Sequence, residues 1–591
     1  MRTPRGAVTA VVLVLVVAGT AALTSMLGQG GGSPRLGFAD ARGSADDVRA
    51  KVAASTRDGE LSESLAPGRG AGAAERLDGA AAIFLSVAAD PDAEVPVEAT
   101  ERVVVTNTSA VDLDDVRLHV LAPAVGATLR VLAAKVGGVG VDARMEGTTM
   151  VLGLRDALAP GESTVVDLSW DLAPVRVTEA ENPNPAEVLK PGGGKSRFDA
   201  QLVRRNLLYL FDWYPRPEPL DAGGWRPLQV DPAIADTHGP ATSVELEVTR
   251  TPDWHVVAGG TRVRDDAGDA HASSRFVLAG SRVMPLVLQR NAVERTVSKG
   301  VYRGIGFGLD TFGPAVEDSA GQALAAKAVM SEATGSPFWR DVVVVGLVFG
   351  GDATSFVADN VVFVRQDVLA RGVPGLGPGT QPSDYRQAAF EGSTAEWWGG
   401  VVDVDATAAP ALRTGVRQSA AAVVWRGVGG DAIGRVATAD VARRYRVARA
   451  AGTPDMAADL DVSAYTTAAT RDIAVSKAAL VYQALGVAVT GDSPAAWDGT
   501  LDVFGSLADA ASLDPGSVAA AATGAGVDRG RADALVGSWL RGTDGDATIG
   551  RADGLGTIVY FTDGAAADAA AGASPTVPLD LDAVKGAGPG W

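Results

Sequence analysis

The pattern of apolar residues changes part-way along the chain, from short strand-like runs to long helix-like segments, and this change constrains the fold more than any other feature. From about residue 80 to about residue 291, short runs of β-branched or alternating apolar residues are separated by turn clusters such as the APGE segment at 159–162. Many short strands with regular turns predict a β-sandwich or a related all-β domain. From about residue 315 to about residue 540, long Ala-rich segments with helical periodicity accompany one strongly apolar strand at 341–349. The second part is therefore predicted to be α+β and mostly helical.

The individual elements are predicted from periodicity and from their Gly and Pro boundaries. The predicted strands of the first part are 81–87, 102–107, 116–122, 150–154, 164–168, 244–249, 255–258, 275–278 and 284–288. The predicted helices of the second part are 315–332, 385–398, 410–425, 438–451, 467–485 and 529–540.

The N-terminal segment predicts a membrane anchor. Residues 7–27 contain no charged side chain and match the ~20 apolar residues that a membrane-spanning helix needs. Arg2 and Arg5 precede this run, which favours a cytoplasmic N-terminus and a body outside the cytoplasm. The alternative is a secretory signal cleaved near the small residues at 19–22, which would give a secreted protein. The Gly-rich segment at 28–33 that follows is typical of a flexible tether.

These patterns divide the chain into five segments. They are a signal anchor or signal peptide at 1–30, a linker at 31–79, a β-domain at 80–292, a mostly helical domain at 293–545 and a tail at 546–591. The tail is rich in Ala, Gly and Asp, a composition that predicts weak order. The expected fold class is thus multi-domain: a membrane-spanning segment, a β-sandwich-like domain and a mostly helical α+β domain.

Composition excludes several classes of function. The 52 Lys and Arg residues are outnumbered by 71 Asp and Glu, giving a net charge of −19, so no basic face for nucleic acid is expected. Cysteine is absent, which excludes disulfides, thiolate zinc sites and cysteine nucleophiles. The chain has only four histidines, and their spacing does not predict a joint metal site; they are His119, His238, His255 and His271.

Several segments resemble a known family. The segment YLFDWYPRPEPLDAGGW from residue 209 and the later ATSVELEVTRTPDWHVVAGG resemble the end of the N-terminal β-domain in the aminopeptidase N family of gluzincin zinc metallopeptidases. PSDYRQAAFEGSTAEWWGGVVDVDATAAPALRTGV resembles that family's zinc-site region, and ADALVGSWLRGTDG resembles the last helix of its catalytic domain. The resemblance covers about residues 80–545 and implies that the helical part is a thermolysin-like peptidase domain, with a cleft between it and the β-domain.

The resemblance also locates the family's active-site positions. The family binds zinc with the two histidines of an H-E-x-x-H helix and a later Glu, and the Glu of the motif is the general base. Trp397-Trp398-Gly399 matches the family's Trp-Trp-Gly just after this motif. The corresponding positions here are Glu391 and Ala395 for the histidines, Gly392 for the general base, Thr414 for the later Glu and Val475 for the transition-state tyrosine. A further alignment puts Val357 where the family has an acidic residue for the substrate amine.

The spacing of the motif is kept while its chemistry is replaced. No histidine follows His271, so the helical domain cannot contain an H-E-x-x-H motif in any register. Glu391 and Glu396 are five residues apart and point in different directions on a helix, which argues against a carboxylate pair. Trp397 and Trp398 are possible cleft residues, although large aromatic side chains near a helix end usually pack in a core.

These observations predict a catalytically inactive homologue of zinc aminopeptidases, with no metal and no cofactor. The expected protein is a membrane-tethered, extracytoplasmic pseudopeptidase that serves as a binding or scaffold module for a peptide or a membrane-protein partner. Two alternatives stay open. One is an active hydrolase of the aminopeptidase type that uses a relocated site, and the other is a purely structural accessory subunit of a membrane complex.

Overall fold

The structure is a computed structural model that describes residues 81–543 and the short strands 558–559 and 576–577. Within 81–543 it leaves out 178–200, 205, 229–239, 241, 300–301, 335–340, 348–354, 371–382, 402–409, 430, 461–463, 466, 491–495, 508–509 and 511–512. The predicted anchor at 1–30, the predicted linker at 31–79 and most of the predicted tail lie outside the described residues.

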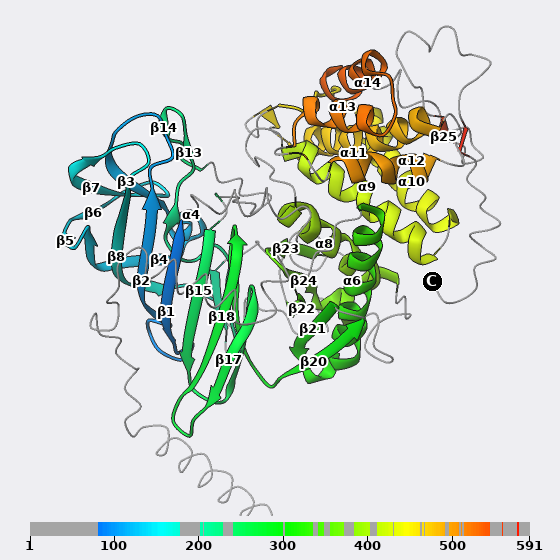
Figure 1. Cartoon of the computed structure of the whole chain (residues 1–591). Coiled ribbons are helices and arrows are strands. Elements are labelled where there is room, and N and C mark those ends of the chain that lie inside the picture. Colours follow the sequence, from blue (N-terminus) through cyan, green and yellow to red (C-terminus); the bar gives the residue numbers. More distant parts are fainter. Residues whose placement is uncertain are drawn as a thin grey trace, which may run out of the picture.

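In the described residues, the first part of the chain forms three larger sheets and the two-stranded sheet of β13 (Leu220–Asp221) and β14 (Gly224–Trp225), and Figure 1 shows this part on one side of the molecule. In pairing order, the eight-stranded sheet consists of β17 (Thr261–Ala267), β18 (Ala272–Ser281), β15 (Thr242–Arg250), β1 (Ala82–Ala89), β2 (Val97–Thr106), β8 (Ser163–Ala173), β4 (Thr128–Val136) and β5 (Val139–Gly140). The five-stranded sheet consists of β16 (Trp254–Ala258), β19 (Leu286–Arg290), β11 (Leu207–Leu210), β10 (Gln201–Arg204) and β9 (Val175–Arg176). The four-stranded sheet consists of β12 (Arg216–Pro217), β3 (Leu113–His119), β7 (Thr149–Leu158) and β6 (Ala143–Glu146).

One hydrophobic core joins these three sheets. It includes Leu85 and Leu168 from the eight-stranded sheet, Leu118 from the four-stranded sheet and Leu288 from the five-stranded sheet, all fully buried. Strands that alternate buried and more exposed residues, such as β15, present one face to this core. We refer to this part as the β-domain.

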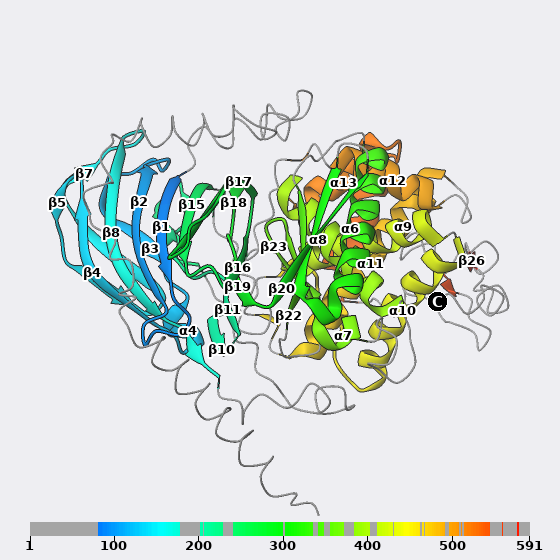
Figure 2. The ribbon, with the colours of Figure 1, turned by 90° about the horizontal axis from the view of Figure 1, so that it is seen from below.

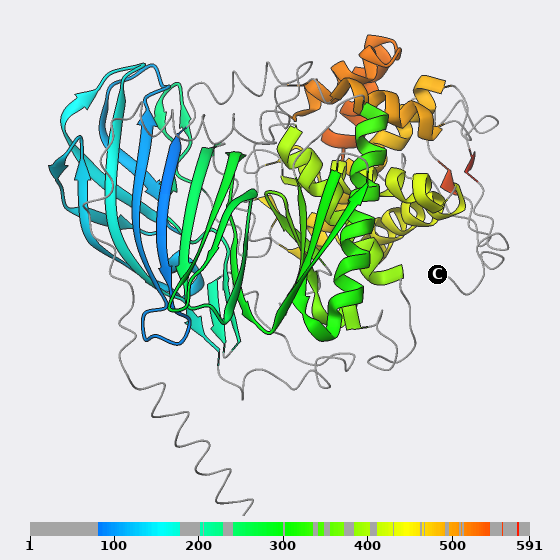
Figure 3. The same cartoon turned by 60° about the horizontal axis from the view of Figure 1, so that its bottom comes forward.

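A second five-stranded sheet begins directly after the β-domain. Its strands, in pairing order, are β20 (Ala292–Lys299), β21 (Tyr302–Leu309), β22 (Val342–Leu347), β24 (Val361–Arg365) and β23 (Ser355–Ala358). The sequence VVVVGL of β22 is buried at every position, as expected for a central strand that pairs in parallel with β21 and β24. The antiparallel strand β23 lies at the edge. Figure 3 shows the long helix α6 (Gly313–Thr334) lying along this sheet.

The helices that follow pack mainly on one another. They are α7 (Gln366–Ala370), α8 (Ser383–Val401), α9 (Pro410–Gly429), α10 (Asp431–Ala450), α11 (Ala468–Thr490), α12 (Ala496–Leu507), α13 (Pro515–Gly524) and α14 (Arg529–Val536). Helix α11 contacts α9, α10, α12 and α14 and is therefore central. By length and composition α11 could cross a membrane, but most of it is buried inside the protein, as in the core helix of a globular domain.

The β-domain and the second sheet share a core of their own. The ring of Tyr209 on β11 packs edge-on against Phe356 on β23 and Phe363 on β24, with centroid distances of 6.2 and 5.3 Å. Val287 of the β-domain and Val345 of the second sheet belong to the same cluster. The strands β20 to β24 consequently lie between the other sheets and the helices, which Figure 2 shows from below.

The main elements confirm the change from strands to helices, but several details differ from expectation. Strands β4 (Thr128–Val136) and β17 (Thr261–Ala267) correspond to no predicted strand. The second part contains a five-stranded sheet and not one or two strands, because the short, Gly-rich segment YRGIGFGL forms β21. The strand expected at 116–122 ends at His119, and α4 (Ala122–Val125) follows with a proline in its first turn. Helices α12 and α13 were not expected; α13 begins at a capping box between Asp514 and Ser517.

Candidate functional site

Helix α8 carries the segment that resembles an H-E-x-x-H helix, and it packs between a sheet and a helix. It contacts β23 and β24 of the second sheet and the helices α6 and α9, while α9 contacts α11. The structure therefore brings together the elements that carry Glu391 and Ala395 (α8), Thr414 (α9), Val475 (α11) and Val357 (β23). The geometry at each position shows what this region can do.

Gly392 lies directly against strand β24. A Cβ atom added at Gly392 would be 2.2 Å from Cγ1 of Val362 and 3.2 Å from its Cβ and Cγ2 atoms. Val362 is completely buried and belongs to the core beneath α6 and α8. A side chain at position 392 therefore fits only if Val362, α8 or β24 shifts.

The neighbouring positions on α8 and α9 are partly or fully enclosed. Glu391 and Thr414 are half-buried, and Ala395 is buried. The next residue after Thr414, Gly415, is pressed against α11, where an added Cβ would be 2.4 Å from the Cβ of Ala478. Helices α9 and α11 thus approach closely beside Thr414.

Hydrophobic side chains occupy the interior between these helices. Val475 and Trp398 belong to one core cluster together with Leu412 of α9. The ring of Trp398 is fully buried and lies edge-on to Phe504 of α12 at a centroid distance of 5.2 Å. Trp398 is therefore a packing residue of the helical core, whereas the side chain of Trp397 lies outside the described part of the chain.

Two buried lysines hold carboxylates next to this core. Glu396 on α8 lies 3.7 Å from the ammonium group of Lys327 on α6, and neither side chain is exposed by more than 1%. Lys477 on α11 donates to the carboxylate of Asp455 at 3.1 Å and to the carbonyl oxygens of Met456 and Gly542. Each pair fixes one helix to another segment, since a buried charge is tolerated only when it is paired.

A hairpin turn connects the edge strand β23 to the β-domain. The carboxylate of Asp359 accepts hydrogen bonds from Ser281 Oγ at 2.6 Å and from the backbone N–H of Arg282 at 2.8 Å. Asn360 Oδ1 accepts from the backbone N–H of Gly260 at 2.7 Å, and its Nδ2 donates to the carbonyl of Asp341 at 2.8 Å. The strand that carries Val357 is consequently held rigidly between the two parts of the molecule.

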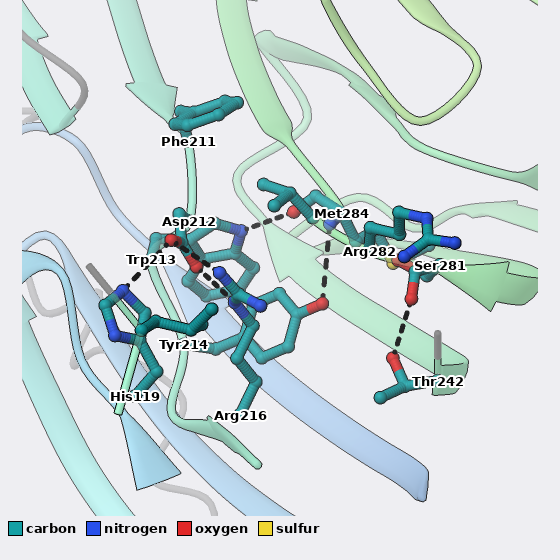
Figure 4. Close-up of polar contacts among 12 residues, drawn as sticks. His119, Phe211, Asp212, Trp213, Tyr214, Arg216, Thr242, Ser281, Arg282 and Met284 are labelled. Carbon is teal, nitrogen blue, oxygen red and sulfur yellow. Dashed lines mark hydrogen bonds and ion pairs between the residues drawn. The ribbon is translucent and has the colours of Figure 1, made fainter. Parts of the chain in front are cut away.

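A second polar cluster lies inside the β-domain and is shown in Figure 4. The carboxylate of Asp212 binds the guanidinium of Arg216 at 2.6 and 3.0 Å and lies 3.3 Å from Nε2 of His119. Nδ1 of His119 is 3.7 Å from Glu218, which also accepts from Thr149 Oγ1 at 3.0 Å. The side chains of His119, Asp212 and Arg216 are fully buried or nearly so, which makes this cluster a structural network rather than a site for a substrate.

Electrostatics inside this cluster favour the charged forms. Burial lowers the pKa of His119, but the nearby carboxylates of Asp212 and Glu218 outweigh it and raise the pKa above its usual value. Burial raises the pKa of Asp212, but Arg216 and His119 outweigh it and hold the pKa of this carboxyl well below its usual range.

Comparison with solved structures relates this geometry to known proteins. The chain is similar to the M1 zinc metallopeptidase from Deinococcus radiodurans, with a TM-score of 0.53 and 16% identity over 78% of this chain and 93% of that chain. A mutant of the Deinococcus radiodurans enzyme matches with a TM-score of 0.52, 16% identity and 78% and 94% coverage. A mutant two-domain M1 zinc metallopeptidase bound to L-arginine matches with a TM-score of 0.52, 15% identity and 78% and 93% coverage. No model of a protein family matches the sequence, and neither does any curated protein.

The chain has the fold of an M1 zinc metallopeptidase.

The residues that the sequence resemblance assigns to zinc binding do not form a zinc ligand set. Zinc needs three ligands from His, Cys, Asp or Glu and an open fourth position. Of Glu391, Ala395 and Thr414, only Glu391 offers a carboxylate, and the methyl group of Ala395 cannot coordinate. Among the described residues, no group of three or more His, Cys, Asp or Glu side chains is arranged to hold a metal ion. His238 lies outside the described residues.

The sequence motifs did not predict two groups of charged residues that the structure contains. The cluster around His119 and Asp212 joins residues far apart in the chain, so no local sequence pattern indicates it. Arg413 and Arg417 on α9 could have been noticed, since two arginines four residues apart interrupt a segment of mostly small and apolar residues. Arg413 is buried beside Thr414, with an exposure of 2%.

Proposed function

We propose that this protein is a pseudopeptidase: an M1-like fold that binds a peptide or a protein segment without hydrolysing it. The observation that carries this proposal is the contact at Gly392. The family's general base would occupy this position, and here even a Cβ atom would lie 2.2 Å from Val362. A Glu side chain would fit there only if Val362 were displaced, and this close packing of α8 on β24 supports the proposal.

The surrounding residues support the same interpretation. Ala395 and Thr414 cannot replace a histidine and a glutamate as zinc ligands, and Val475 offers no phenol to stabilise an oxyanion. Val475 is buried in the helical core at 6% exposure. Substitutions at several positions of one active site, each accommodated by close packing, are expected when selection for catalysis has ended but the fold is still needed.

The proposed binding or scaffold role is supported by the contacts that join the β-domain to the second sheet. The turn at Asp359 and Asn360 and the rings around Tyr209 join the β-domain to the second sheet. A rigid body with an M1 fold is suited to hold a peptide or a segment of a membrane protein. We further propose that residues 7–27 tether this body to the membrane with the body outside the cytoplasm; a cleaved signal and a secreted protein are the alternative.

Zinc content and hydrolysis together test the proposed function. We expect the purified full-length chain, dialysed against zinc and then against buffer, to hold well below one zinc ion per chain in elemental analysis. We also expect no cleavage of aminoacyl reporter substrates above a mock purification. An active M1 enzyme treated in parallel is the control. One tightly held zinc ion per chain together with aminopeptidase activity would disprove the proposal, and activity without zinc would favour a relocated site.

Localisation is tested separately. We expect the full-length chain in the membrane fraction and accessible to protease added to intact cells. A full-length chain in the cytosol would contradict the tether, and a shortened chain in the medium would show that the signal is cleaved. Affinity capture from solubilised membranes then distinguishes a peptide-binding module from a structural subunit, because only the latter remains in a stable stoichiometric complex.

A further inference from the structure

Each ring nitrogen of His119 faces a carboxylate. His119 is the last residue of β3, and its partners in the sheet are Arg216 of β12 and Thr149 of β7. Nε2 is 3.3 Å from Asp212 and Nδ1 is 3.7 Å from Glu218, and none of these three side chains is exposed. A neutral imidazole has one N–H and one lone pair, so it would turn the lone pair toward one of the two carboxylates. Imidazolium presents an N–H to both, so the geometry favours the charged ring.

The charges of this cluster balance only when His119 is protonated. Asp212 and Glu218 bring two negative charges, and Arg216, which is 1% exposed, brings one positive charge. A neutral His119 would leave these four groups with a net negative charge in the protein interior, where an uncompensated charge is costly. The pKa of His119 agrees with this count: burial and, to a lesser degree, Arg216 lower it, but the two carboxylates outweigh both and raise it.

Both carboxylates belong to one segment, residues 211–218, which leaves β11 and passes through β12. Asp212 near its start has a backbone φ of 46°, a left-handed conformation that a residue other than glycine keeps only where the surroundings hold it. Glu218 at its end accepts hydrogen bonds from Thr149 Oγ1 at 3.0 Å and from the backbone N–H of Leu228 at 2.6 Å. The imidazole of β3 thus lies between the two ends of this segment.

The middle of the same segment reaches the junction with the second sheet. Trp213 Nε1 donates to the carbonyl oxygen of Met284 at 3.0 Å, and the backbone N–H of Met284 donates to the hydroxyl of Tyr214 at 3.4 Å. Two residues before Met284, the backbone N–H of Arg282 donates to Asp359 in the turn between β23 and β24. Figure 4 shows the contacts that run from the imidazole to Met284. A displacement of segment 211–218 would therefore disturb the residues that hold this turn.

We propose that His119 is a pH-sensitive latch: its imidazolium holds segment 211–218 on the four-stranded sheet, and loss of its proton lets the segment open and loosens the junction with the second sheet. The inference is independent of the proposed function, because it involves neither the zinc position nor a substrate.

Linkage gives the direction of the pH effect. In the open segment His119 meets water and has its ordinary pKa of 6.5, whereas in the closed segment its pKa is higher. The closed form therefore binds the proton more tightly, and opening increases as the pH rises from 6.5 to the pKa of the closed form. Above that pKa opening no longer changes with pH, because both forms have lost the proton.

The protonation of His119 is measured directly by NMR. The chain contains four histidines, so the full-length protein with ¹³C at the histidine Cε1 atoms gives few signals, which single His→Gln variants assign. If His119→Gln does not fold, the variants of the other three histidines assign His119 by elimination. We expect His119 to titrate above 6.5. A His119 that is already neutral at pH 6.5 would overturn the latch.

Hydrogen exchange measures the opening. Exchange of peptides that cover 211–218 and 281–284 is followed by mass spectrometry at several pH values above 6.5, and each rate is divided by the intrinsic rate at that pH. We expect the protection of both segments to fall with rising pH, by up to about tenfold per pH unit until the pKa of closed His119 is reached. Strand β22, buried at every position, is the internal reference and should keep its protection.

Two histidine variants complete the test. In His119→Gln the protection of 211–218 should no longer depend on pH, because the titrating group is gone. His271→Gln is the matched control, since His271 is exposed in the turn between β17 and β18, and it should behave like the wild type. Protection of 211–218 that is independent of pH in the wild type, or equally dependent on pH in His119→Gln, would disprove the latch. Opening of 211–218 without any change at 281–284 would disprove the link to the second sheet.

Discussion

Replacing Gly392 by Ala tests the packing of α8 on β24. The new methyl group would lie 2.2 Å from Cγ1 of Val362, whereas carbon atoms in contact are ~3.5–4.0 Å apart. Overpacking of this kind costs typically ~1–3 kcal/mol, and the upper end applies here because Val362 is fully buried in a central position. Replacing Gly by Ala inside a helix returns about 1 kcal/mol. We therefore expect Gly392→Ala to lower the free energy of unfolding by about 2 kcal/mol.

A double-mutant cycle shows whether Val362 is the cause. Val362→Ala alone should cost about 2 kcal/mol, because two buried methyl groups are lost and a cavity remains. In this background the methyl group introduced by Gly392→Ala enters vacated space, so the second substitution should be neutral or stabilising. The expected coupling between the two sites is about 2–3 kcal/mol.

Urea unfolding followed by tryptophan fluorescence measures each variant. Gly321→Ala on α6 is the matched control, since an added Cβ there meets nothing within 4 Å. This control should raise stability by up to about 1 kcal/mol. If Gly392→Ala unfolds at the same urea concentration as the wild type, or if the effects of Gly392→Ala and Val362→Ala on the free energy of unfolding simply add, Gly392 is not packed against Val362. The main support for the proposal that position 392 no longer accommodates a general base would then be removed.

Three further predictions concern the core, the buried cluster and the zinc position. Trp398→Ala should lower the free energy of unfolding by ~3–5 kcal/mol, the range for a buried large aromatic, and Trp398→Phe by clearly less; equal effects would mean that the ring is not buried against Phe504. The pKa of His119 is raised in the folded protein, so the stability that protonated His119 contributes is fully present below its ordinary pKa of 6.5 and is lost as the pH rises through the folded pKa. The pKa of Asp212 is lowered, so the stability that its carboxylate contributes is present above its ordinary pKa of 3.8 and is lost as the pH falls through the folded pKa. His119→Gln should therefore flatten the loss of thermal stability above neutral pH, and an unchanged slope would contradict the role of His119. The quadruple variant Glu391→His, Gly392→Glu, Ala395→His and Thr414→Glu should be less stable than the parent without zinc and be rescued only partly by zinc; tight zinc binding with peptidase activity would show that the interior has kept a catalytic shape.

Local patterns in the sequence determined much of the architecture. The continuous apolar run of β22 and the long Ala-containing segments of α8, α9 and α11 each identify an element without reference to the rest of the chain. The lack of any histidine after His271 determined that no H-E-x-x-H helix exists in the second part. Short Gly-containing strands such as β21 were missed, because a Gly-rich segment acquires strand structure only through its neighbours.

Which residues pack around the positions aligned with the family's active site was decided by the tertiary structure alone. Periodicity reports that a residue is buried but not which residue covers it, so the contact of Gly392 with Val362 could not be predicted. The same holds for Glu396 on α8 with Lys327 on α6. Charges far apart in the chain become neighbours only when the elements that carry them pack together, and their energies depend on distance and burial, which a sequence does not contain.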